Sequence, residues 1–281
     1  MNVLIAGCGY VGTVLARRLL DAGHVVHGLR RDPSGLPPGI RPVAADLADP
    51  ASLRGLPPTL THVVYAASAG GYTPDAYRAA YVDGVDNLVA ALHAQGQPVA
   101  RFVFTGSTGV YAQDGGAWVD ETSPAEAAGF SPDALREGER RALESGFPAT
   151  VVRLSGIYGP GRTRTIDGVR DGSARRWRDR QVYLNHIHRD DAAGVLAHVL
   201  ALPDPRPLYL GTDDEPADRS EVLAWIAARL GLPTPPETEA PARARGSERR
   251  YRNARLRAAG YRFTYPTYRE GYAALLRDAT P

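Results

Sequence analysis

The chain has 281 residues, of which 43% are hydrophobic and 23% charged, the composition of a globular protein with one large domain or a domain and a small appendage. The net charge of +2 gives no indication of nucleic-acid binding, and the one cysteine, Cys8, excludes an intrachain disulfide and a cysteine-based zinc cluster. No apolar run approaches the roughly 20 residues of a membrane span, and no basic leader precedes the first predicted strand. We therefore expect a cytoplasmic protein that contacts neither membrane nor nucleic acid.

A strand, a glycine-rich turn and a helix open the chain. Residues 3–6 form an unbroken apolar run, which is typical of a strand buried on both faces of a parallel sheet. Gly7, Gly9 and Gly12 follow with G-x-G-x-x-G spacing, and an amphipathic helix comes next. The positive end of that helix would face a pyrophosphate. The candidate dinucleotide-binding residues are Gly7, Gly9, Tyr10, Val11 and Gly12.

The second predicted strand, residues 24–29, ends at two arginines. Arg30 lies 18 residues after Gly12, close to where an acidic residue would hold the ribose 2′-OH of NAD. Arginine suits the 2′-phosphate of NADP instead, through charge-assisted hydrogen bonds. We therefore expect Arg30 and Arg31 to bind NADP, with NAD as the alternative cofactor and a solvated pair as the alternative role.

Asp46 and Leu47 follow the third predicted strand, residues 41–45. An aspartate at a strand end can accept a hydrogen bond from the adenine amino group or cap a turn, and the sequence favours neither role. If the adenine lies here, both residues belong to the cofactor site.

The fourth predicted strand, residues 61–67, ends in small side chains. Ala66 and Ala67 would let the cofactor lie close above the strand end. A long helix is predicted over residues 74–94, from its apolar spacing.

The fifth predicted strand, residues 101–106, is followed by a hydroxyl-rich turn from Ser107 to Tyr111. Ligands of open α/β sheets bind at the carboxyl ends of the strands, so this turn is a functional candidate. Serine and threonine also favour such turns for local reasons. A helix over residues 133–145 and a sixth strand over residues 149–154 come next.

Arginines are concentrated after the sixth strand. The cluster could form an electropositive lid for an anionic substrate, but a solvated face is the favoured interpretation. Its members are Arg162, Arg164, Arg170, Arg175, Arg176, Arg178 and Arg180. His186 and His188 lie two residues apart with no third ligand in an obvious pattern, so we expect packing or hydrogen bonding and no metal site.

Further elements are expected at residues 183–187 (strand), 188–202 (helix), 207–211 (strand) and 220–230 (helix), with a linker over residues 233–242. Together the elements predict a Rossmann-like α/β fold with a doubly wound parallel sheet. We expect residues 1–160 to form the dinucleotide-binding core. Residues 161–281 would return to that core at about 181–215 and then form a small, aromatic-rich C-terminal substrate lobe.

The chain resembles the extended short-chain dehydrogenase/reductase superfamily, in particular its NAD-dependent epimerase/dehydratase-like members. The resemblance covers nearly the whole chain, and its closing stretch looks like a divergent, atypical branch. The motifs that carry it are Gly7 to Gly12, Asp46-Leu47, Tyr81 to Gly84 with Asn87-Leu88, Ser107 to Tyr111, Arg153 to Gly161 and Ile187 to Ala192. The family implies a homodimer through the helices at residues 74–94 and 133–145.

The family also implies a tyrosine general acid/base, a lysine four residues later and a serine or threonine that orients the substrate. Ser107 matches the serine position. With the family helix aligned on Glu144, Arg136 and Arg140 stand where the tyrosine and lysine belong. No tyrosine lies between Tyr111 and residue 158, and the chain has no lysine, since all 33 basic residues are arginine.

Another group must therefore move any proton, because arginine keeps its own proton far above pH 7. Arg140 could still offer positive charge to the cofactor's ribose or diphosphate. We rank Tyr111 with Ser107 as the first catalytic candidates, ahead of Tyr158, His186 and His188.

Three functions follow from these motifs. The first is an atypical, NADP-dependent oxidoreductase that reduces a carbonyl or imine in a small molecule with a non-standard proton donor. The second is a non-catalytic NADP(H)-binding sensor or interaction protein. A sugar-nucleotide epimerase or dehydratase is third, because the residues that cycle the hydride are missing. Retention of Ser107 favours an enzyme, although fold alone does not establish function.

Overall fold

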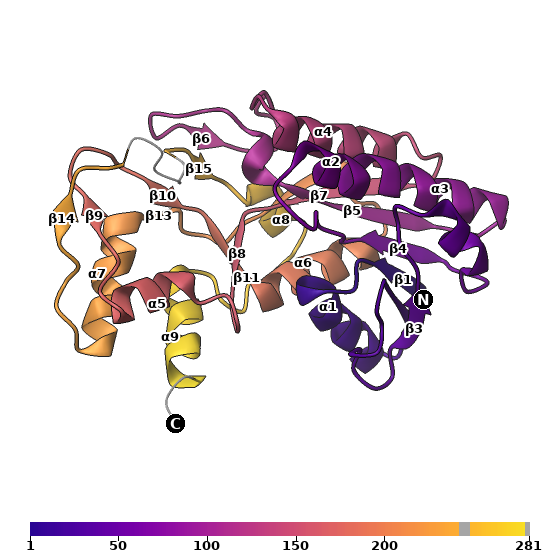
Figure 1. Cartoon of the computed structure of the whole chain (residues 1–281), viewed down its shortest axis with the longest axis horizontal. Helices are drawn as coiled ribbons and strands as arrows, with labels where there is room; N and C mark the ends of the chain where they lie inside the picture. The colour runs from indigo at the N-terminus through magenta and orange to yellow at the C-terminus, as the bar shows by residue number, and fades with distance from the viewer. Residues whose placement is uncertain (242–247, 279–281) are drawn as a thin grey trace. The chain divides into compact units, whose positions relative to one another are not determined.

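The computed structural model describes residues 1–241 and 248–278, which fold into two compact units (Figure 1). Unit 1 comprises Met1–Ala112, Pro124–Leu154 and Ala192–Tyr209. Unit 2 comprises Gln113–Ser123, Ser155–Asp191 and the described part of Leu210–Pro281. The units are interleaved along the sequence, so a single boundary near residue 160 does not separate them. The last residue of the predicted linker, Ala242, lies outside the described residues.

A seven-stranded sheet with the order β12-β7-β5-β4-β1-β2-β3 forms the centre of unit 1, and every adjacent pair from β7 to β3 is parallel. The strands are β1 (Asn2–Ala6), β2 (Val25–Arg30), β3 (Arg41–Ala44), β4 (His62–Tyr65), β5 (Arg101–Ser107), β7 (Ala149–Leu154) and β12 (Leu208–Gly211). The chain order reverses between β1 and β4. This sheet confirms the predicted Rossmann-like fold and places the topological switch point at the end of β1.

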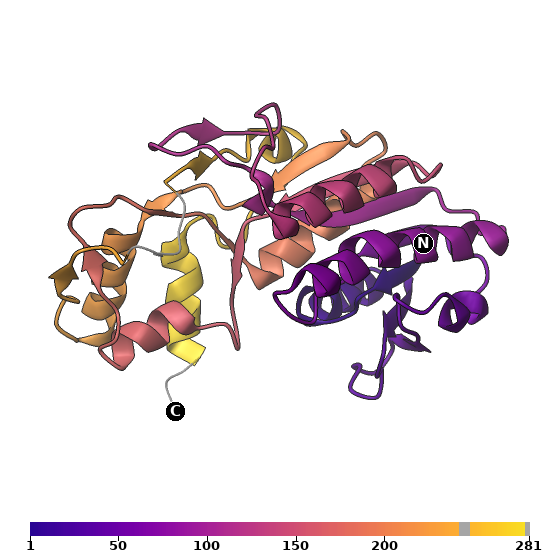
Figure 2. The same ribbon diagram turned by 45° about the horizontal axis from the view of Figure 1, so that its top comes forward.

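Helices cover both faces of this sheet (Figure 2). The helix α1 (Tyr10–Asp21) lies on one face with α6 (Arg189–Ala201), and α2 (Pro74–Arg78), α3 (Gly84–Ala94) and α4 (Phe130–Leu143) lie on the other. Phe102, Phe104 and Tyr65 are fully buried between the sheet and the second group of helices. The apolar runs of the parallel strands therefore have the two-sided cover that their sequence requires.

The helix predicted over residues 74–94 contains one irregular turn. Ala79–Asp83 is π-helical and joins α2 to α3. The Tyr65 hydroxyl donates to the carbonyl oxygen of Ala80 at 2.5 Å. A Cβ atom at Gly138 would lie 2.2 Å from the Tyr81 carbonyl oxygen, so α4 approaches this turn backbone to backbone. The widened turn thus occurs where a tyrosine and a neighbouring helix both meet its carbonyl groups.

Unit 2 is built on α5 (Arg164–Arg170), α7 (Arg219–Leu230) and α9 (Tyr268–Asp278), and a short α8 (Ala254–Ala258) precedes α9. Tyr268 and Tyr272 are buried in its core with apolar residues of α5 and α7. Four two-residue to three-residue strand pairs complete the unit. They are β8 (Gly156–Tyr158) with β11 (His186–His188), β10 (Tyr183–Leu184) with β13 (Ala217–Asp218), β9 (Arg176–Trp177) with β14 (Glu237–Thr238), and β6 (Trp118–Val119) with β15 (Arg250–Tyr251).

The strand predicted over residues 183–187 is split into β10 and β11. Asn185, between them, donates to the Arg249 carbonyl oxygen and accepts from the Tyr251 amide, so its side chain replaces strand pairing at that point. Over the described ranges, no helix is both long and apolar enough to cross a membrane.

Candidate active site

The turn after β1 can be formed only by glycine at its first position. Gly7 has φ +88°, and a Cβ atom there would lie 2.4 Å from the backbone of Ala67 after β4. The amides of Gly7 and Cys8 both donate to the Leu29 carbonyl oxygen at 3.0 Å. The turn is therefore held between β2 and β4, at the switch point of the sheet.

Gly12 and Gly9 serve different purposes in the same turn. A Cβ atom at Gly12 would lie 2.9 Å from the Gly7 carbonyl oxygen and 3.1 Å from the Ile5 side chain, so glycine lets α1 pack on β1. At Gly9 the nearest atom would be 3.9 Å away, and this residue is exposed. No side chain caps the start of α1, and its first turn, which begins with Tyr10 and Val11, holds no acidic residue. This geometry fits a pyrophosphate at the helix N-terminus.

Arg30, at the end of β2, lies near this turn. Burial raises the pKa of the Cys8 thiol, and a hydrogen bond with Thr13 and the positive charge of Arg30 oppose that rise. Cys8 is fully buried and protonated, so it fills space beneath the turn. Arg30 is half-buried and Arg31 is exposed, so both side chains reach the surface.

Asp46 and Leu47 form a turn after β3. An Asp46 carboxylate oxygen accepts from the Ala48 amide at 3.0 Å, and the Leu47 carbonyl oxygen accepts from the Asn87 side chain at 2.9 Å. The structure thus gives Asp46 the turn role that the sequence left open.

Ala66 and Ala67 lie directly after β4 and are half-buried, beside Gly7. Ser107 ends β5, and its hydroxyl accepts from the Gly109 amide at 3.1 Å, where it begins the 3-10 turn Thr108–Val110. The Ser107 side chain is half-buried. These residues stand at the carboxyl ends of neighbouring strands, the edge of the sheet where α/β proteins bind ligands.

Tyr111, in contrast, is 1% exposed and its hydroxyl is engaged inside unit 1. Arg153 Nη1 donates to the Tyr111 oxygen at 2.8 Å, and Arg153 Nε and Nη2 donate to the Glu139 carboxylate at 2.9 and 2.6 Å. The Arg153 and Glu139 side chains are 10% and 7% exposed. Tyr111 can therefore anchor the Ser107 turn. Its buried hydroxyl is not accessible to a substrate.

Sequence reasoning missed this buried ion pair. Two signals could have indicated it: Arg153 interrupts the apolar strand at residues 149–154, and Glu139 lies four residues after Leu135 on the apolar side of its helix. A charge at such a position is rarely buried without a partner.

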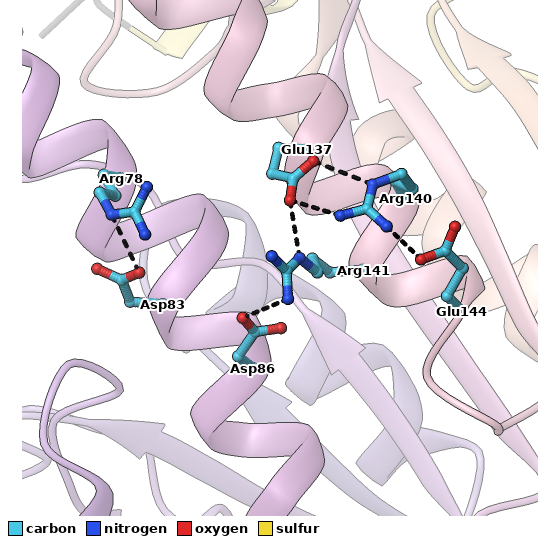
Figure 3. Close-up of polar contacts among 7 residues, drawn as sticks. All are labelled: Arg78, Asp83, Asp86, Glu137, Arg140, Arg141 and Glu144. Carbon is cyan, nitrogen blue, oxygen red and sulfur yellow. Dashed lines mark hydrogen bonds and ion pairs between the residues drawn. The ribbon is translucent and has the colours of Figure 1, made fainter.

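The exposed side of α4 carries Arg140, one of the two arginines that the family alignment placed in the site. Arg140 pairs with Glu137 and Glu144, and Arg141 pairs with Glu137 and with Asp86 of α3 (Figure 3). The residues of α4 that are buried toward the sheet are Leu135, Gly138, Glu139 and Ala142. Arg140 therefore lies on the exposed side of α4, and its contact with the ribose or diphosphate of the cofactor stays a prediction.

The other candidate proton donors lie in unit 2 and are neutral. Burial raises the pKa of Tyr158 far above its usual value, and burial lowers the pKa of His186 to about 4. Burial also lowers the pKa of His188, although the carboxylate of Asp190 opposes this. The three rings pack together, with centroids 5.1 Å apart for Tyr158 and His186 and 5.3 Å apart for Tyr158 and His188. They form an enclosed group in unit 2.

Several arginines after the sixth strand have partners. Arg176 pairs with Glu237 at 3.0 Å, and Arg180 pairs with Glu248 at 2.8 Å. This pairing fits the solvated face that the sequence favoured. Among the described residues, no group of three or more histidine, cysteine, aspartate or glutamate side chains could hold a metal ion.

Comparison with known proteins places this arrangement in context. The model of the NAD-dependent epimerase/dehydratase family matches residues 3–208. The chain is 29% identical over 259 residues (83% of this chain and 77% of the relative) to a 2-alkyl-3-oxoalkanoate reductase of Stenotrophomonas maltophilia. It is 28% identical over 260 residues (82% and 69%) to a 3 beta-hydroxysteroid dehydrogenase/Delta 5→4-isomerase of Mycobacterium tuberculosis.

Solved structures with the same fold cover the full chain. One, provisionally assigned as an NAD-dependent epimerase/dehydratase of Methylobacillus flagellatus, has 36% identity, coverage of 100% and 99%, and a TM-score of 0.83. A protein of unknown function from Silicibacter pomeroyi has 30% identity, full coverage of both chains and a TM-score of 0.79. The human epimerase family protein SDR39U1, solved with NADPH, has 21% identity, coverage of 99% and 100%, and a TM-score of 0.80, which shows the shared fold.

Proposed function

The chain belongs to the NAD-dependent epimerase/dehydratase family, and on that premise we propose that it is an NADP(H)-dependent oxidoreductase that reduces a carbonyl or imine group in a small molecule. The observation that carries the proposal is the Gly7–Gly12 turn, which is closed against Ala67 and Ile5 but open at Gly9. The reductase and dehydrogenase names of the two curated relatives support an oxidoreductase.

Different residues at the sheet edge would bind different parts of the cofactor. The α1 N-terminus binds the pyrophosphate, and Arg30 and Arg31 bind the 2′-phosphate. Ala66 and Ala67 leave room for the cofactor above β4, and Asp46 and Leu47 border the adenine. Bound NADPH supplies a hydride to an electrophilic carbon.

Ser107 is the substrate-facing hydroxyl in this proposal, since it is half-buried at the end of β5. Tyr111 acts through the turn that it anchors, because its own oxygen accepts a hydrogen bond from Arg153. With no tyrosine on α4 and no lysine in the chain, an imine fits best. Its nitrogen is readily protonated in water and needs little help from a strong protein acid.

A panel experiment tests turnover. The protein is saturated with NADPH and offered small ketones, 3-oxo acids and cyclic imines, while loss of the NADPH absorbance is followed. The proposal expects one class to be reduced and the Ser107→Ala variant to lose that activity. Tight NADPH binding without turnover on any class would support the second candidate, a non-catalytic NADP(H) sensor. The observation in favour of that candidate is the ion-paired Arg140, four residues after Arg136, where the family motif is absent.

The homodimer that the family resemblance implies is also a proposal. Its helices would be α3 and α4, whose outer sides hold the ion pairs of Figure 3. Molar mass from light scattering distinguishes a dimer from a monomer.

A further inference from the structure

Four aromatic rings gather where α2, the following π-helical turn and the start of α4 meet in unit 1. The ring centroids of Tyr72 and Phe130 are 4.9 Å apart, and Tyr77 lies 5.6 Å from Tyr72, 5.4 Å from Phe130 and 5.4 Å from Tyr81. We call these four residues the aromatic cluster. The Tyr72 residue is 73% exposed, whereas Tyr77, Tyr81 and Phe130 are half-buried. The Tyr72 ring is therefore exposed to solvent and packs on the half-buried rings of the cluster.

One side of the cluster is joined to the dinucleotide turn. The loop that carries Tyr72 begins at Ala67, which meets the backbone of Gly7. Burial raises the pKa of the Tyr81 hydroxyl, and the backbone of Ala69, in the middle of that loop, opposes this rise. Tyr81 itself lies on the π-helical turn that Tyr65 and α4 hold in place. The loop that carries Tyr72 therefore starts beside the dinucleotide turn.

The other side of the cluster is joined to the Ser107 turn. The Ala127 amide donates to the Val110 carbonyl oxygen at 3.0 Å, and Arg136 Nη1 donates to the Ala127 carbonyl oxygen at 2.6 Å. Phe130 begins α4 three residues after Ala127. Both turns proposed to serve the reaction are therefore connected to the same group of rings.

We infer that the aromatic cluster binds an apolar alkyl or aryl group of the substrate whose carbonyl or imine meets Ser107. This inference rests on the proposed function and narrows its substrate class. Aromatic faces gain free energy from contact with apolar groups in proportion to the area removed from water. The nearby charges are already paired, Arg78 with Asp83 and Arg136 with Asp133, so the cluster offers no unpaired cation from these arginines to a diphosphate. A neutral apolar substituent is the occupant that matches this surface.

A homologous series of ligands tests the inference. Methyl ketones from 2-pentanone to 2-nonanone are titrated into full-length protein saturated with NADP⁺, and dissociation constants are obtained by saturation-transfer NMR. Each buried methylene contributes about 0.8 kcal/mol, which corresponds to about a fourfold fall in Kd, and partial burial leaves about twofold. We expect that stepwise fall in the wild-type protein.

Two variants assign the effect to the cluster. Tyr72→Ala should flatten the chain-length dependence without disturbing the fold, because the ring is 73% exposed. Phe130→Ala should do the same. Leu143→Ala, on the same helix as Phe130 and 44% exposed, is the control and should keep the wild-type slope.

Three results would overturn the inference: no chain-length dependence in the wild type, an unchanged slope in Tyr72→Ala, or UDP-glucose binding that exceeds every ketone and is lost in Tyr72→Ala. Failure of the proposed function is distinguished by a separate titration. A protein that binds no NADPH contradicts the cofactor assignment, and the ketone series repeated without cofactor still reports on the cluster.

Discussion

Arg153 on β7 and Glu139 on α4 form a buried ion pair, in which Arg153 Nε and Nη2 donate hydrogen bonds of 2.9, 3.2 and 2.6 Å to the carboxylate. The remaining guanidinium nitrogen, Nη1, donates to the Tyr111 hydroxyl oxygen at 2.8 Å. One arginine thus joins a strand, a helix and the end of the Ser107 turn. In a chain without lysine, arginine is also the residue whose planar group can make such a three-way contact.

Removal of one partner from this buried pair should lower the free energy of unfolding much more than removal of one partner from an ion pair at the surface. Arg153→Ala leaves the Glu139 carboxylate buried and unpaired, so we expect a loss of about 3–5 kcal/mol in the free energy of unfolding. Urea unfolding measures it. Arg141→Ala, which removes the half-exposed pairs with Asp86 and Glu137, is the control and should lower the free energy of unfolding far less. Equal losses of unfolding free energy in the two variants would show that burial does not make the Arg153–Glu139 pair more important for stability.

Two glycines of the turn should respond differently to alanine. Gly7→Ala meets the Ala67 backbone at 2.4 Å in a left-handed conformation, so its thermal unfolding temperature should fall clearly. Gly9→Ala has open space and should keep the wild-type unfolding temperature, while its NADPH affinity falls at least about tenfold because the added methyl group stands where the pyrophosphate would lie. Unaltered NADPH binding in Gly9→Ala would place the cofactor elsewhere.

The two arginines after β2 should control cofactor choice. Replacement of Arg30 by Asp and Arg31 by Ala removes charge-assisted hydrogen bonds and adds repulsion toward the 2′-phosphate. The Kd for NADPH should rise by a factor between about 10 and 100. The Kd for NADH should change little, and parallel fluorescence titrations compare the two. Equal changes for both cofactors would show that these arginines do not recognise the phosphate.

How much of this site follows from sequence depends on the range of the interaction. The Gly7–Gly12 turn and the apolar parallel strands were predicted correctly, because a tight turn and a two-sided strand are specified by neighbouring residues. The Arg153–Glu139 pair was not predicted, because it depends on how α4 packs on β7. For the same reason, the ion pairs of Arg140 with Glu137 and Glu144 could not be read from the family alignment.

The division into units shows the same limit. The sequence indicated where strands and helices lie, but Gln113–Ser123 joins unit 2 through the pairing of β6 with β15, more than 120 residues later in the chain. The aromatic cluster also depends on distant segments, since Phe130 meets Tyr72 only when α4 packs beside α2. Contacts of this kind have no local signature.

His186 is half-buried with an enclosed Nδ1 atom, and it should make the stability of the protein depend on pH. Burial lowers its folded-state pKa to about 4 from 6.5, so the neutral ring stabilises the fold above pH 6.5. That contribution, at most about 3 kcal/mol, is lost as the pH falls from 6.5 to about 4. Urea unfolding across this range should show a steeper fall for the wild type than for His186→Phe. Parallel pH profiles would contradict the assignment.

Ser107 should affect turnover and not cofactor binding. On whichever class of carbonyl or imine the protein reduces, Ser107→Ala should lower kcat by about 100-fold, the usual effect of losing one polar group that orients the reacting atoms. The Kd for NADPH should stay within about twofold of the wild type. Tyr111→Phe, which keeps the buried ring, provides the comparison. A larger loss of kcat in Tyr111→Phe than in Ser107→Ala would make the phenol the proton donor.

We propose that the open glycine turn binds NADP(H). The most direct test is a fluorescence titration of the wild-type protein with NADPH and, separately, with NADH. We expect saturable binding of both, with NADPH at least about tenfold tighter because of Arg30 and Arg31. Absence of saturable binding for either nucleotide would contradict it.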